Sequence, residues 1–176
     1  MKARLLLIPL SPLALAAPAY AVTYLTVEQA QTLMFEGSVL TRDFRVLTPA
    51  QVQAIESDSG VKVADAQLNA WRDGTGGWFL LDQVIGKHEF IHYAVALDAN
   101  GAVRQLEILD YHESYGGEVH LPAWRRQFIG KHHGSPLQLN SDIKNISGAT
   151  LSCGHVTDGV RRLLSTYALV LASAEH

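Results

Sequence analysis

Two apolar runs in the middle of the chain lie on either side of a short turn-forming sequence. Residues 90–97 and 103–109 are rich in β-branched, aromatic and aliphatic side chains, and Asp98-Ala99-Asn100-Gly101 separates them. This is the pattern of a β-hairpin. Residues 68–72 and 78–81 flank a second turn-like sequence that contains three glycines, at residues 73–77. The middle of the chain therefore predicts short antiparallel strands.

Helical patterns stand on both sides of this β-rich region. Thr26 is a candidate N-cap for a helix over residues 23–36, and Pro49 occupies the first position of a second helix that ends near residue 60. Residues 122–129 can form an amphipathic helix, and residues 152–171 have the clearest helical period in the chain. Helices packed against an antiparallel sheet define an α+β fold.

Size and composition limit what such a fold can do. A chain of 176 residues suits a single domain, with 48% apolar and 18% charged residues in a globular balance. The 14 Lys and Arg against 17 Asp and Glu give a net charge of −3, which lacks the basic excess of a nucleic-acid-binding protein. The single cysteine, Cys153, excludes an internal disulfide and is expected to be a small core residue.

The N-terminus has the layout of a secretory signal. A basic start precedes an uncharged apolar stretch over residues 5–17, and Ala19-Tyr20-Ala21 provides a cleavage site. A retained membrane anchor is the weaker alternative, because a span requires about 20 apolar residues and two prolines interrupt this stretch. We therefore expect residues 1–21 to be a signal peptide, residues 22–176 to be the mature domain, and the periplasm to be its location.

His88-Glu89-Phe90-Ile91-His92 matches the zinc-protease pattern HExxH. That chemistry requires a helix, since only a helical turn brings positions i and i+4 onto one face within reach of one ion. Here the surrounding residues favour a strand, on which the two imidazoles would lie about 13 Å apart. We therefore reject a metal-dependent hydrolase, assign no metal ligands, and expect a strand with His88, Phe90 and His92 on one face.

Small and hydroxyl-bearing residues stand immediately before the C-terminal helix, after a loop-like stretch over residues 134–145. They are Ser147, Gly148, Ala149, Thr150 and Ser152. Small residues let the backbone approach a ligand, the hydroxyls can donate to phosphate oxygens, and a helix N-terminus offers unpaired N–H groups and a positive dipole end. The segment thus predicts a phosphate-bearing ligand, and the alternative is that these residues only cap the helix.

Taken together with other segments in the same order, this motif resembles the FMN-binding domain family. The resemblance covers residues 87–167 and is carried by segments 93–98, 106–109, 112–114, 127–131, 142–150 and 156–160, with Trp124. The family includes peripheral flavin subunits of Rnf-type and sodium-pumping NADH:quinone reductase complexes. In that family the last Thr of the Ser-Gly-Ala-Thr motif carries FMN through a phosphoester, installed by a flavin transferase that uses FAD. The resemblance therefore implies FMN as the cofactor and Thr150 as its attachment point.

The resemblance also implies roles for residues near Thr150. Ser147, Gly148, Ala149 and Ser152 would form the phosphate cradle, and Glu113, Tyr115 and Trp124 are candidates to lie near the flavin ring. The alternatives are that Trp124 belongs to the core and that Glu113 is a solvated loop acid. In place of the Thr-Pro pair that often follows the family's His-x-Glu, this chain has Ser114-Tyr115, so Tyr115 occupies a position at which the family pattern changes.

The function implied is that of an exported flavoprotein electron carrier rather than a stand-alone enzyme. The mature domain would combine a helical N-terminal part, residues 23–60, with the family core at residues 87–167. The implied partners are an FAD-dependent flavin transferase and a redox donor and acceptor, for which a membrane electron-transfer complex is a candidate. The alternative is an exported binding module on the same fold, with FMN absent or reversibly bound.

Overall fold

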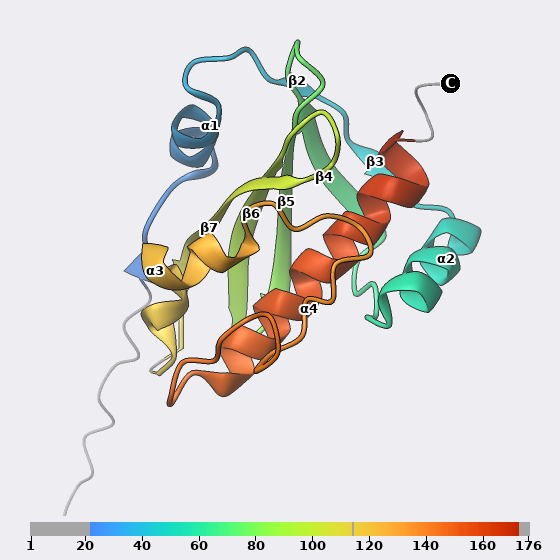
Figure 1. Cartoon of the computed structure of the whole chain (residues 1–176). Helices are drawn as coiled ribbons and strands as arrows, with labels where there is room; N and C mark the ends of the chain where they lie inside the picture. The colour runs from blue at the N-terminus through green and yellow to red at the C-terminus, as the bar shows by residue number, and fades with distance from the viewer. Residues whose placement is uncertain (1–21, 114, 173–176) are drawn as a thin grey trace, which may run out of the picture.

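The computed structural model describes residues 22–113 and 115–172 and contains one antiparallel sheet with helices on both of its faces (Figure 1). Along the sheet the strand order is β1-β7-β6-β5-β4-β2, and β3 pairs with β4 beside this path. The strands are β1 (Val22–Thr23), β2 (Thr41–Arg42), β3 (Arg45–Val46), β4 (Gln67–Arg72), β5 (Trp78–Ile85), β6 (Phe90–Leu97) and β7 (Val103–Tyr111). The predicted hairpin is β6 and β7, in which Val95 faces Leu106. The predicted α+β fold class is confirmed.

The first N-terminal helix begins after the predicted cap Thr26, and so later than the predicted residue 23, and the second begins at Pro49 as predicted. Thr26 caps α1 (Val27–Phe35) and Thr48 caps α2 (Pro49–Ser59). In both, the cap hydroxyl accepts from the N–H of a glutamine three residues later, and that glutamine's side chain accepts from the cap N–H. This reciprocal pairing satisfies two backbone donors that a helix start otherwise leaves open.

Two C-terminal helical segments differ from their predicted bounds. The segment predicted as one helix at residues 122–129 divides into α3 (Pro122–Arg125) and a 3₁₀ turn, η2 (Arg126–Phe128), after another 3₁₀ turn, η1 (Gly117–His120). The last helix, α4 (Thr150–Thr166), begins two residues before the predicted start and continues as a π-helical turn, η3 (Tyr167–Leu171). Thr150 is therefore the first residue of α4.

Side chains alternate between two cores on the two faces of the sheet. The larger core lies under α4 and includes Tyr93, Val95 and Leu97 of β6. The smaller core lies under α1 and contains Ala94 and Ala96 of the same strand. Figure 1 shows α4 crossing the face of the sheet diagonally, with α2 beside its C-terminal half.

The middle of α4 lies unusually close to the sheet. A Cβ atom added at Gly159 would lie 2.3 Å from Tyr93 Oη and 2.8 Å from Val84 Cγ1, so only glycine permits this approach. Arg162 donates to Asp82 Oδ2 over 2.6 Å, and Tyr93 Oη donates to the same oxygen over 2.6 Å. Burial and the neighbouring Asp82 raise the pKa of Tyr93 well above its ordinary value, so the phenol stays neutral. These contacts fix where the first turn of α4 meets the sheet edge.

The HExxH segment is not helical. Residues 87–89 form a bend, and β6 begins only at Phe90. The prediction that His88 shares a strand face with Phe90 and His92 is wrong, because the Gly86 N–H donates to the Glu89 carbonyl over 2.7 Å and closes a turn before the strand. His88 thus lies in the β5–β6 turn.

The predicted signal peptide falls on residues 1–21, which lie outside the described part of the chain. Among the helices of residues 22–113 and 115–172, none combines the length and apolar character needed to cross a membrane. Cys153 is fully buried in the larger core, as predicted, and burial raises the pKa of its thiol.

Candidate functional site

A cavity of about 420 Å³ lies at the N-terminal end of α4. Segments far apart in sequence line it: the β5–β6 turn with Lys87 and His88, the segment after β7 with Glu113 and Tyr115, and residues 148–152. Its volume falls within the range of about 300–1,000 Å³ that is typical of small-molecule and cofactor sites. The strand order brings these segments together, because the β5–β6 turn and the end of β7 meet at the same end of the sheet.

The first turn of α4 presents open backbone donors to this cavity. Ala149 is the N-cap and offers no side-chain hydrogen bond. The first N–H groups of any helix lack intrahelical partners, and the helix dipole makes this end positive. Gly148 has a φ of 85°, in the left-handed region that favours glycine, and no atom lies within 4 Å of where its Cβ would be. The segment before α4 therefore leaves open space beside uncapped N–H groups.

Thr150 places its hydroxyl at this open end. The residue is exposed and lines the cavity. Its Oγ1 accepts a hydrogen bond of 2.8 Å from Asn145 Nδ2. An accessible hydroxyl beside unpaired N–H groups is suited to carry a phosphate group.

The two serines of the predicted cradle lie in different surroundings. Ser152 lines the cavity but is only 5% exposed, and its Oγ lies 2.8 Å from Tyr111 Oη. A Cβ at Gly116 would lie 2.6 Å from that Tyr111 oxygen and 2.8 Å from Ser152 Oγ, so the glycine lets the loop after β7 approach α4. Ser147 is exposed and is not among the cavity-lining residues. The structure thus brings Gly148, Ala149, Thr150 and Ser152 to the cavity, and Ser147 lies beside it.

Glu113 lines the cavity and also stabilises the β5–β6 turn. Its Oε1 accepts hydrogen bonds from the backbone N–H groups of His88 and Glu89, over 2.5 and 3.0 Å. Burial opposes ionisation of this carboxyl, but hydrogen bonds from the turn outweigh it, and the pKa of Glu113 lies below its ordinary value. The carboxylate therefore holds the β5–β6 turn, and with it Lys87 and His88, at the cavity.

Tyr115 and Trp124 were both predicted to lie near the flavin ring, but only Tyr115 is at the cavity. Tyr115 lines the cavity with its side chain 86% exposed. Trp124 is 4% exposed, packs edge-on against Phe128 and does not line the cavity. Its indole N–H donates to the Lys144 carbonyl over 2.8 Å. This placement favours the alternative that Trp124 is a core residue, and shows that it supports the loop leading to Thr150.

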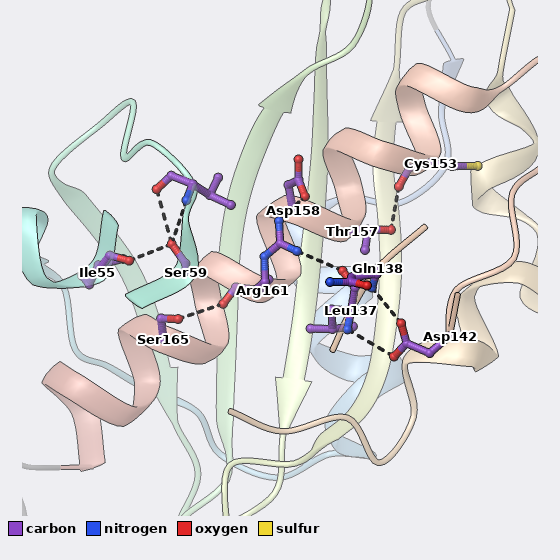
Figure 2. A network of polar contacts seen from close by, with 11 residues as sticks. Ile55, Ser59, Leu137, Gln138, Asp142, Cys153, Thr157, Asp158, Arg161 and Ser165 are labelled. Atoms are coloured by element: carbon purple, nitrogen blue, oxygen red, sulfur yellow. Dashed lines mark hydrogen bonds and ion pairs between the residues drawn. The ribbon is translucent and has the colours of Figure 1, made fainter. Parts of the chain in front are cut away.

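The loop before Thr150 is held by side chains on both of its flanks. Gln127 Oε1 accepts from the Lys144 N–H over 2.7 Å, opposite the Trp124 contact. Earlier in the loop, Asp142 accepts from the N–H groups of Leu137 and Gln138, over 3.1 and 2.7 Å (Figure 2). Arg161 of α4 donates to the Leu137 carbonyl over 3.1 Å. A stretch without regular secondary structure is thereby fixed against α4.

Sequence reasoning missed several residues of the site. Lys87, His88 and Leu151 line the cavity, and Asn145 contacts the Thr150 hydroxyl. For Lys87 and His88 the available signal was the glycine that precedes them, which predicts a turn rather than a strand start. His155 connects α4 to the end of β5, since its Nδ1 lies 2.6 Å from the Ile85 carbonyl oxygen.

A model of the FMN-binding domain matches residues 86–165, which include every residue that lines the cavity. No curated protein matches the chain at a significant level. The residues present fit FMN, since an open helix N-terminus suits its phosphate and the cavity volume suits a cofactor. Residues 86–165 of this chain therefore match an FMN-binding domain, and this match indicates FMN as the cofactor.

Proposed function

We propose that this protein is an exported flavoprotein that carries electrons through an FMN attached covalently to Thr150. The observation that supports this best is the position of the Thr150 hydroxyl. It is exposed, belongs to the first residue of α4 and opens onto a cavity of about 420 Å³ within the FMN-binding domain. A transferase can therefore reach this oxygen in the folded protein.

The attachment is a phosphoryl-group transfer with FAD as co-reactant. Thr150 Oγ1 forms a bond to the phosphorus on the riboflavin side of FAD, and the P–O bond of the pyrophosphate breaks. AMP leaves with the electron pair of that bond, and the hydroxyl proton passes to a base of the flavin transferase. In the product, the uncapped N–H groups of α4 stabilise the negative phosphodiester. Gly148, Ala149 and Ser152 leave room for it, and Ser147 lies at its outer side.

Bound FMN supplies one- and two-electron chemistry through its ring system. The chain's own residues orient the cofactor and adjust its electrostatic surroundings. Tyr115 and Leu151, 86% and 51% exposed, offer apolar surface at the cavity. Lys87 brings a positive charge, held there because Glu113 fixes the β5–β6 turn. A nearby cation stabilises negative charge, and so favours the reduced cofactor over the oxidised one.

Export of the protein and covalent attachment of FMN to Thr150 are consistent with each other. The sequence at residues 1–21 has the layout of a secretory signal. Outside the cytoplasm free FMN is scarce, so a cofactor that dissociated would be lost, and a phosphoester to Thr150 prevents that loss. The partners in this proposal are the flavin transferase and a redox donor and acceptor, with a membrane electron-transfer complex as the candidate.

Mass measurement on protein produced with and without the flavin transferase tests the proposal. With the transferase, the intact mass rises by one FMN moiety and the yellow colour survives denaturation. As the test of export, the N-terminus of the protein is Val22. The Thr150→Val variant keeps the β-branched shape but has no hydroxyl, so it folds and carries no flavin after denaturation. Flavin that survives denaturation in Thr150→Val places the attachment elsewhere. Wild-type protein without bound flavin points instead to a binding module.

A further inference from the structure

Thr150 receives a hydrogen bond from a side chain five residues earlier in the loop. Asn145 Nδ2 donates to Thr150 Oγ1 over 2.8 Å. The other end of the same amide has no such contact, since Asn145 Oδ1 is buried and has no hydrogen-bond partner within the described residues. The amide therefore serves the Thr150 hydroxyl at one end and is unsatisfied at the other.

The direction of this hydrogen bond suits an oxygen that is going to react. A threonine side chain in a helix divides between rotamers, and a fixed donor selects the one that places Oγ1 next to it. Asn145 donates to a lone pair of Oγ1 and does not use the hydroxyl proton. The contact can therefore persist when the proton leaves and the oxygen becomes part of an ester. An acceptor at the same place would lose its partner in that reaction.

The unpaired Asn145 Oδ1 indicates that this side chain serves a function and does not serve the stability of the fold. A buried polar atom without a partner lowers the stability of the folded state, and a leucine of similar size avoids this cost. The backbone of the loop is held independently, because Trp124 Nε1 and Gln127 Oε1 both bind the peptide groups of Lys144. A change at residue 145 therefore alters the side chain and leaves the path of the loop in place.

We propose that Asn145 is a positioning residue for flavin attachment. Its amide holds Thr150 Oγ1 in the rotamer from which this oxygen attacks the FMN phosphorus of FAD in the transferase. Asn145 neither gains nor loses a proton in this step; the hydroxyl proton goes to the transferase and the electron pair leaves with AMP, as above. The inference rests on the proposed attachment at Thr150.

Loading kinetics and thermal unfolding of Asn145→Leu test this role. Flavin-free exported protein is incubated with purified flavin transferase and FAD, and the loaded mass is followed over time at several protein concentrations. We expect the maximal loading rate to fall about tenfold, as for the loss of one orienting hydrogen bond. The protein concentration at half-maximal rate stays unchanged, and the unfolding temperature of flavin-free protein equals or exceeds that of wild type.

Matched variants make the outcome specific. Asn69→Leu, the same replacement on β4 away from the cavity, should load like wild type. Asn145→Ala removes the amide with a smaller side chain and should also load slowly, which keeps the test valid if leucine does not fit. Asn145 variants that load as fast as wild type overturn the inference alone. Slow loading accompanied by a lower unfolding temperature in both variants shows a structural role and also overturns it. Wild-type protein that takes up no flavin at Thr150 overturns the proposed attachment and this inference with it.

Discussion

The middle of α4 and its first turn differ in how their polar groups are paired. In the middle, the Arg162 guanidinium donates to Asp82, the Lys62 carbonyl and the Gln83 carbonyl, and Gly159 brings the helix against Tyr93. In the first turn no side chain caps the helix and Thr150 is exposed. One helix therefore combines a closely packed segment with an open one, and the packed segment lets the open end keep unpaired donors without losing its position.

Removing the buried cation should have the largest effect on stability. Arg162→Met leaves Asp82 with the Tyr93 hydrogen bond but without its positively charged partner in a largely buried place, so we expect the free energy of unfolding to fall by about 3 kcal/mol. Urea denaturation measures this. Arg161→Met, at the adjacent and more exposed arginine that pairs with Asp158, should cost about 1 kcal/mol or less. Equal losses in the two variants would contradict the assignment of α4 anchoring to Arg162. Below its unfolding temperature, Arg162→Met should still accept flavin at Thr150.

The Trp124 contact with the loop before Thr150 should contribute less to stability than Arg162 does, and more to the rate of flavin loading. Trp124→Phe removes the indole N–H and leaves the Lys144 carbonyl without that donor, which should cost about 2 kcal/mol. Loading at Thr150 should also slow, because the loop that carries Asn145 is then held only from the Gln127 side. Flavin fluorescence of the loaded protein should not change, since Trp124 does not line the cavity. A large rise in fluorescence would instead place the indole against the ring.

The charge at the cavity should affect the cofactor and not the fold. Lys87→Met removes a cation next to the bound FMN, so the midpoint potential should fall by about 30 mV, equivalent to about 1.4 kcal/mol for two electrons. Spectroelectrochemical titration measures the shift. Lys62→Met changes an exposed lysine that pairs with Glu56 away from the cavity and serves as the control. A potential that is equal in both variants would show that Lys87 does not face the ring.

The smallest effect should be the pH dependence of the stability that Glu113 gives to the protein through the β5–β6 turn. The folded-state pKa of Glu113 is lowered from 4.5, so its contribution is complete above the unfolded-state pKa and is lost as pH falls through the folded-state pKa. Wild type should therefore be more stable than Glu113→Gln at about pH 6, and the difference should shrink as the pH falls below 4.5 and vanish below the folded-state pKa. Urea midpoints of the two proteins across this range provide the measurement. A difference that persists at the acidic end would mean that the carboxylate charge is not what holds the turn.

Much of the fold could be predicted from local patterns, because turns and caps depend on a few adjacent residues. The β6–β7 hairpin, the Thr26 cap and Pro49 at the first position of α2 are examples. The placement of His88 on strand β6 was wrong, because the Gly86–Glu89 hydrogen bond closes a turn before Phe90 and the apolar pattern does not show that bond. The division of residues 122–129 into α3 and η2 was likewise not visible in the amphipathic period.

The site was predictable only where a linear motif carries it. Gly148, Ala149, Thr150 and Ser152 lie next to one another in sequence and meet at the cavity, and that grouping could be seen in the chain. The direction of a side chain could not be seen: Trp124 points into the core, and Glu113 accepts from the β5–β6 turn. Lys87 meets Thr150 at the cavity because strand pairing and the packing of α4 on the sheet bring distant segments together, which composition and spacing do not encode.

The location of the cavity at the end of the sheet has a consequence for how fast electrons could enter and leave. Lys87, His88, Tyr115, Thr150 and Leu151 all line the cavity and all are exposed. A redox partner docking on this end of the molecule would meet the cofactor across the surface, with neither the sheet nor either core in between. The tunnelling distance would then be set by how closely the two proteins approach. Exchange would need no internal relay, and the choice of partner would depend on the shape and charge of this rim.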